Sequence, residues 1–231
     1  DESYPKIEIL RQLVWSYKPS IIFMQGENGA PSTLKEVTIG AMRDKDWSEL
    51  TQAKWDLRRM LGDHGRGIAT NLFTISDIHY APGDHMVGVN TKGLLKTNPD
   101  KTIERPKMAY KAAQHVFSLF DETLNPDSSV RLQSSEKNQS YFGYSHKKNS
   151  RPLVTLWQNE DRPSEAYEAK KTTLKVEGAQ FEKPVFVDLI SGKIYEIPKT
   201  SWKKEGKDFL FIDVPVPDYP VIIAESSSLK K

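Results

Sequence analysis

The fold is decided by residues 21–32, which read Ile-Ile-Phe-Met-Gln-Gly-Glu-Asn-Gly-Ala-Pro-Ser. The first four are apolar without polar alternation, which predicts a short strand buried on both faces, as in a parallel sheet. The glycines and the proline that follow predict a loop over residues 26–32. We therefore expect Glu27 to lie directly after a buried strand, where the chain opens into a loop.

On both sides of this stretch, helices are predicted to alternate with strands. Apolar spacings of three and four predict helices over residues 3–17, 46–61 and 106–124. Residues 68–75 predict a second strand, and residues 77–104 are expected to form a long irregular loop. This alternation is typical of parallel β/α units.

The second helix is expected to bury a single face. Its predicted core positions are Trp47, Leu50, Ala53, Leu57, Met60 and Leu61. Arg58 and Arg59 fall outside that face, and since arginine is rarely buried we expect both to be solvated.

The character of the chain changes near residue 126, beyond which only strands are predicted. They cover residues 140–145, 152–157, 171–176, 184–188, 193–197, 209–214 and 219–224. Turn residues separate them, a pattern that predicts an antiparallel β-sandwich. We place two domains at residues 1–126 and 127–231.

Two parallel strands cannot cover the apolar faces of three helices, and both edges of such a pair would be open. We therefore expect the chain to be part of a larger α/β domain whose remaining strands lie upstream in the parent protein. The alternative is a small, complete three-layer domain with an unusual topology.

Composition excludes several classes of function. The net charge is only +2, which gives no reason to expect a nucleic-acid partner, and no apolar run is long enough to cross a bilayer. Cysteine is absent, which excludes disulfides, thiol catalysis and zinc–thiolate sites. No spacing of histidines and carboxylates fits a metal site, so we expect neither metal nor cofactor.

Candidate chemistry lies after the two predicted strands. In a β/α barrel the carboxyl ends of the strands face the active site, which makes Glu27 a candidate catalytic group. Phe73 and Tyr80 could stack on a sugar face, and Asp77 and His79 could bond its hydroxyls. In the alternative reading, Glu27 is a solvated loop residue or a helix cap, and Asp77 only bonds the loop backbone.

Several of these segments carry a family resemblance. Residues 21–32 resemble the seventh strand and its loop in clan A glycoside hydrolases, and residues 72–77 resemble the eighth-strand segment of the β-xylosidase and α-L-iduronidase family. Residues 93–95 followed by 105–110 resemble the segment that leads into the eighth helix. The resemblance implies the last two strands and helices of a (β/α)₈ barrel followed by an accessory antiparallel β-sandwich. It departs at Phe73, where relatives commonly carry tryptophan.

The same resemblance implies a retaining glycoside hydrolase with Glu27 as nucleophile. The substrate is expected to be an oligosaccharide or polysaccharide, contacted by Asn28, Phe73, Asp77, His79 and Tyr80. The acid/base glutamate belongs after the fourth strand, usually in an Asn-Glu pair, and the pair at residues 159–160 lies in the sandwich instead. We therefore expect the 231 residues alone to be inactive.

Two other functions are weighed beside it. One is a non-catalytic carbohydrate-binding or scaffold protein with a degenerate barrel, and the other is polysaccharide binding by the sandwich itself. The expected location is outside the cytoplasm of a bacterium, secreted or periplasmic.

Overall fold

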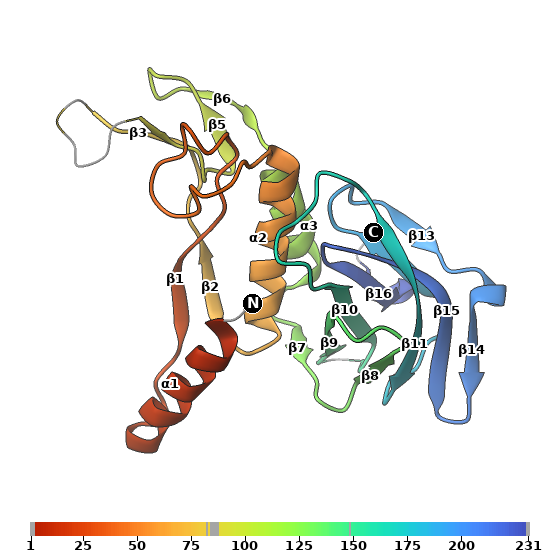
Figure 1. The fold of residues 1–231 in the computed structure, drawn as a ribbon. Coiled ribbons are helices and arrows are strands. Elements are labelled where there is room, and N and C mark those ends of the chain that lie inside the picture. Colours follow the sequence, from red (N-terminus) through yellow and green to blue (C-terminus); the bar gives the residue numbers. More distant parts are fainter. Residues whose placement is uncertain (1–2, 82, 84–87, 148, 230–231) are drawn as a thin grey trace.

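A computed structural model describes residues 3–81, 83, 88–147 and 149–229, and Figure 1 shows a helical part beside two antiparallel sheets. The helical part holds three helices and one parallel strand pair. Its elements are α1 (Ser3–Tyr17), β1 (Met24–Asn28), α2 (Glu49–His64), β2 (Ala69–Leu72) and α3 (Met108–Leu119). The predicted order of a mixed α/β region followed by antiparallel sheets is confirmed. None of the helices in the described part of the chain is long and apolar enough to cross a membrane.

The first strand begins later than its apolar run predicts. Met24 pairs with Ala69 and Gln25 with Thr70, so β1 extends through Glu27 to Asn28. The predicted loop therefore starts three residues too early, at residue 26 instead of residue 29. Burial also differs from the prediction, since Ile22 is 84% exposed and Met24 is exposed as well. A strand pair this small has no further layer to cover these side chains.

The segment predicted as an irregular loop contains two short hairpins. One joins β3 (Ile78–His79) to β4 (Val89–Asn90), and the other joins β5 (Leu95–Thr97) to β6 (Ile103–Pro106). Their strands have two to four residues each, too few for alternation to be visible in the sequence. These hairpins fold the segment back against the end of β2, since Ser76 forms a parallel bridge with Leu95.

Helix α2 is buried on nearly every side. Ser48 caps it through a reciprocal pair of bonds with Thr51, which satisfies donors that a helix start leaves open. The prediction that Arg58 and Arg59 are solvated is wrong, since each is only 8% exposed. The physical reason is that a loop of the sandwich covers this face, and Arg58 donates to the backbone oxygens of Asp218 and Glu160.

The C-terminal part forms a sandwich of two antiparallel sheets. The six-stranded sheet has the order β13-β12-β16-β10-β9-β7, and the four-stranded sheet β14-β15-β11-β8. The bounds are β7 (Leu124–Pro126), β8 (Arg131–Ser134), β9 (Gln139–His146), β10 (Pro152–Gln158), β11 (Ala169–Glu177), β12 (Pro184–Asp188), β13 (Ile194–Glu196), β14 (Trp202–Glu205), β15 (Asp208–Pro217) and β16 (Val221–Glu225).

Every strand predicted beyond residue 139 has a counterpart, whereas the short strands β7, β8 and β14 were not predicted. Strand β7 already pairs with β9, so the sheet begins at Leu124, just before the predicted boundary at residue 126. The boundary itself stays a prediction. Apolar residues of α2 and α3 join those of the sandwich in one cluster, among them Leu57, Val116 and Tyr144. The helical part therefore packs against the sandwich through a shared core.

Candidate active site

The carboxyl ends of β1 and β2 meet at one edge of the parallel pair. The Phe73 backbone nitrogen donates to the Asn28 carbonyl oxygen at 2.7 Å, which prolongs the pairing beyond β2. The following residue of the first loop is Gly29, and a Cβ there would lie 2.3 Å from the Phe73 carbonyl oxygen. Only glycine allows so close an approach, and it holds the two loops in contact.

Glu27 is the penultimate residue of β1, and its side chain is exposed. Side-chain amides fix the strand around it. The Gln25 amide nitrogen donates to the Glu27 carbonyl oxygen at 3.2 Å, and the Asn71 amide nitrogen donates to the Gly26 carbonyl oxygen at 3.1 Å. The nearby cation is Lys92, whose pKa is lowered by burial and partly restored by the charges of Asp56 and Glu27. Sequence reasoning missed this lysine because nothing in the spacing links it to the strand.

Asn28 is buried, in contrast to the exposed Glu27 that precedes it. Its amide nitrogen donates to Asp63 of α2 at 3.3 Å and to Thr70 of β2 at 3.0 Å, and the residue is buried. These bonds attach the end of β1 to the helix layer. A contact of Asn28 with substrate stays a prediction, and the described bonds give it a positioning role.

Asp77 is held inside the loop after β2. One of its carboxylate oxygens accepts from the Gly93 backbone nitrogen at 3.0 Å and from the Lys107 ammonium at 2.5 Å. Lys107 also donates to Ser32 and to the Thr91 carbonyl oxygen, so it joins three loops at this edge. Burial raises the pKa of Asp77 and lowers that of Lys107, and their ion pair partly offsets both shifts. Asp77 therefore makes the bond to the loop backbone that the alternative interpretation predicts, and it also pairs with a lysine.

The remaining predicted residues, Phe73, His79 and Tyr80, lie in the segment after β2 and are half-buried. The His79 Nε2 lies 3.1 Å from the Thr97 carbonyl oxygen, and because that oxygen only accepts, the nitrogen carries the proton. The Tyr80 backbone nitrogen donates to Gly88, on the far side of a loop whose residues 82 and 84–87 fall outside the described chain. Phe73, which precedes a cis peptide bond, connects this group to β1 through its bond with Asn28.

A polar face of α2 supports these loops from behind. Asp56 is fully buried and accepts from the Ala30 backbone nitrogen at 3.1 Å, while the Gln52 amide donates to the carbonyl oxygens of Ala30 and Gly93 at 3.0 and 3.2 Å. Burial raises the pKa of Asp56 to about 8. Residues 52, 56 and 63 are separated by four and seven positions, which places them on one face of a helix. This polar face was not predicted, because the apolar face of the same helix gives the stronger pattern.

Glu27 is thus an exposed carboxylate whose charge interacts with Lys92, and the segment after β2 carries the His79 imidazole and the Phe73 and Tyr80 rings. A carboxylate in such a position can serve as nucleophile or base. A two-carboxylate reaction needs a second carboxyl group about 5–5.5 Å away. Asp77 bonds Lys107 and Gly93, and its predicted contact with substrate stays a prediction.

Comparison with protein-family models finds no match, and comparison with curated proteins finds none either. The function therefore has to be argued from the site itself.

Proposed function

We propose that the chain is the C-terminal part of a retaining glycoside hydrolase and that Glu27 is its nucleophile. The observation that carries the proposal is the placement of an exposed glutamate, Glu27, near the carboxyl end of a parallel strand. The last residue of that strand, Asn28, accepts a backbone hydrogen bond from Phe73 in the loop after the neighbouring strand. In barrels of β/α units, that end of the strands holds the chemistry. The resemblance of these segments to clan A enzymes points the same way.

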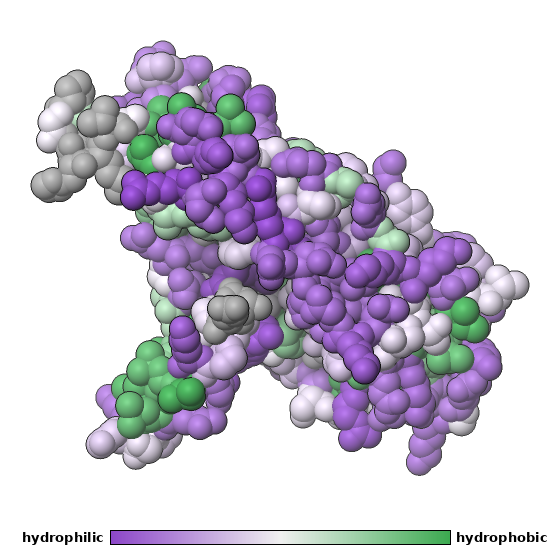
Figure 2. Space-filling view, viewed as in Figure 1, coloured by the Kyte–Doolittle hydropathy of each residue, from purple (hydrophilic) through white to green (hydrophobic). Residues whose placement is uncertain are grey.

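The barrel is part of this proposal, and the exposed apolar surface supports it. In the described chain β1 and β2 pair only with each other, so each has an open outer edge. On the β1 side, Ile9 and Ile22 are 69% and 84% exposed, and Figure 2 shows an apolar patch over α1. On the β2 side, Ile75 and Phe117 are largely exposed around a 300 Å³ hollow.

Burying one such side chain is worth about 1.5–3 kcal/mol, so leaving several in water on both flanks is costly. Further β/α units from the same parent protein would cover both flanks and close the ring. In this proposal they also bring the acid/base carboxyl group. The 231 residues then bind part of the substrate but do not turn it over.

The mechanism follows from two carboxyl groups. Glu27 attacks the anomeric carbon as the glycosidic bond breaks, and the second carboxyl group protonates the leaving oxygen. Water activated by that second group then releases the sugar from Glu27. Lys92 interacts electrostatically with Glu27, while Phe73 and His79 are suited to contact the sugar ring and its hydroxyls.

The test uses the parent protein with its complete barrel. Glu27→Gln should abolish turnover with unchanged thermal unfolding, and azide should restore activity to Glu27→Ala by attacking in place of the missing carboxylate. Glu36→Gln, an exposed glutamate on the same loop, serves as control and should turn over normally. Normal turnover by Glu27→Gln would overturn the assignment, and sugar binding without turnover by the parent would favour the non-catalytic alternative.

A further inference from the structure

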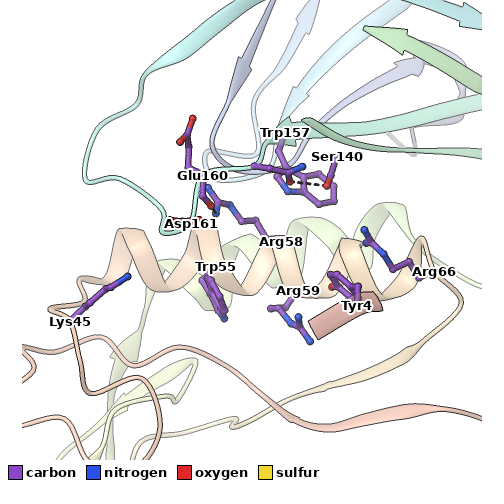
Figure 3. A pocket seen from close by; sticks show the side chains of 11 residues that line it. Tyr4, Lys45, Trp55, Arg58, Arg59, Arg66, Ser140, Trp157, Glu160 and Asp161 are labelled. Carbon is purple, nitrogen blue, oxygen red and sulfur yellow. Dashed lines mark hydrogen bonds between the residues drawn. The ribbon is translucent and has the colours of Figure 1, made fainter. Parts of the chain in front are cut away.

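A second hollow lies away from the Glu27 edge, where α2 meets the sandwich (Figure 3). Its volume is 430 Å³, within the range of about 300–1,000 Å³ usual for small-ligand sites. The outer face of α2 forms its floor, the ends of β9 and β10 form one wall, and Tyr4 of α1 stands on the other. Nothing in the proposed hydrolysis uses these residues.

The lining is rich in cations. Lys45, Arg58, Arg59 and Arg66 border the hollow. The Arg58 Nη2 has no hydrogen-bond partner although it is buried, and its nearest carboxylate oxygen, on Asp218, is 3.8 Å away. Burial lowers the pKa of Arg58 to about 10, since its neighbours only partly offset the loss of water. An anion that accepts from Nη2 would complete the shell of this guanidinium.

Aromatic rings and an amide stand beside these cations. Trp55 is half-buried, lines the hollow and forms a T-shaped ring pair with Trp47 at a centroid distance of 5.8 Å. On the wall, the Asn159 Oδ1 accepts from the Ser140 hydroxyl at 2.8 Å, so its amide nitrogen remains a donor. Ring faces and amide donors suit a sugar ring and its hydroxyls.

Two carboxylates also border the hollow and could offset its positive charge. The Glu160 carboxylate turns away from α2 in Figure 3 and lies 3.4 Å from the Lys170 ammonium. Asp161 is exposed at the rim. Of the cations, Arg59 pairs with Asp63 at 3.5 Å, while Arg58 lies 3.8 Å from Asp218, a carboxylate that it shares with the closer Lys54 at 2.8 Å. The balance on the floor is therefore positive.

We propose that this hollow binds an acidic oligosaccharide, with a uronic-acid carboxylate against Arg58 and a sugar ring over Trp55. Guanidinium groups bind planar carboxylates in pairs of hydrogen bonds, and the indole supplies the apolar surface that a free inorganic anion would not need. The site is separate from Glu27, so the proposal stands or fails independently of the hydrolase assignment.

The experiment uses the 231-residue chain and follows tryptophan fluorescence. The probes are uronic-acid trisaccharides of galacturonate, glucuronate and mannuronate, with neutral maltotriose and sodium sulfate as comparisons. At least one acidic trisaccharide should bind with a Kd below about 1 mM, and Arg58→Gln should weaken that binding at least about tenfold, as expected for a charge-assisted bond. Arg131→Gln, a surface arginine paired with Glu177 on the sandwich, should leave it unchanged.

Because Arg58 also bonds the sandwich backbone, Lys45→Gln and Trp55→Leu provide a second arm with fewer structural consequences. Each should weaken the same binding at least about threefold without shifting thermal unfolding by more than a few degrees. The proposal is overturned if no acidic trisaccharide binds, or if maltotriose or sulfate binds as tightly as the acidic trisaccharides. It is also overturned if folded variants of all three residues bind the acidic trisaccharide with wild-type affinity.

Discussion

Removing the ammonium of Lys107 tests the claim that one ion pair holds the loops of the candidate active site. Lys107 is 2% exposed and lies 2.5 Å from Asp77, and it also donates to Ser32 and Thr91. Lys107→Met keeps the aliphatic stem but leaves the Asp77 carboxylate with only its backbone donor. Breaking a buried pair in this way costs about 3–5 kcal/mol, so we expect a loss of that size in the free energy of unfolding at pH 7.

The assay is urea-induced unfolding followed by circular dichroism. The matched control is Lys96→Met, because Lys96 makes an exposed pair with Glu104 at 3.1 Å, and such pairs contribute about 0–1 kcal/mol. The double variant Lys107→Met with Asp77→Asn should recover part of the loss, since an amide needs no counter-charge and still accepts from the Gly93 nitrogen.

The pH dependence gives a second signature. Burial raises the pKa of Asp77 and Lys107 lowers it, so removing Lys107 raises it further. A carboxyl pKa that is raised in the folded protein favours folding at low pH. It lowers the free energy of unfolding once the pH exceeds the pKa of the same group in the unfolded chain. The deficit of Lys107→Met should therefore shrink as the pH falls from about 7 to about 4. A loss below about 1 kcal/mol at pH 7, equal to that of Lys96→Met, would refute the reasoning.

Three further variants probe the supports around the site. The free energy of unfolding of Asp56→Asn should increase relative to that of the wild type as the pH rises from about 4 to about 8, because the raised pKa of Asp56 makes its ionisation costly over that range. Urea titrations at several pH values would measure this difference. Gly29→Ala should cost about 1–3 kcal/mol against the Phe73 carbonyl, whereas Gly26→Ala, with open space around it, should cost well under 1 kcal/mol in the same assay. Asp218→Ala should lower the free energy of unfolding by at least about 3 kcal/mol, since it leaves a buried lysine and a buried arginine of α2 without their shared carboxylate.

Much of the fold could be predicted because its elements carry strong local periodicity. Apolar spacing predicts helices over residues 3–17 and 46–61, which are observed over Ser3–Tyr17 and Glu49–His64, and it also predicts the longer sandwich strands. The exact start of β1 could not be predicted, because the strand is defined by pairing with β2 rather than by its apolar run. The hairpins within residues 77–104 are too short for any periodic signal.

The candidate site could be predicted only in part. Glu27 stands out in the sequence because it follows an apolar run, and Asp77 follows the second strand in the same way. The lysines near them do not stand out, since no sequence spacing predicts that Lys107 pairs with Asp77 or that the charge of Glu27 acts on Lys92. A cation just before a helix start opposes the helix dipole, and this was the one signal that Lys107 had a specific partner.

The same limitation explains why Arg58 was expected in solvent. It lies outside the apolar stripe of α2, and the loop that covers it comes from more than 100 residues away along the chain. Burial of this kind depends on how the sandwich docks, which local patterns do not determine.

The most direct test of the central claim is covalent trapping of the nucleophile. The complete parent protein would be incubated with the 2-deoxy-2-fluoro analogue of the sugar it releases, which slows breakdown of a glycosyl-enzyme, and then digested with trypsin. We expect the tryptic peptide covering residues 12–35 to gain the mass of one fluorosugar, attached at Glu27. The same peptide from the Glu27→Gln variant should remain unlabelled. A label on a different carboxylate, with residues 12–35 unmodified, would contradict it.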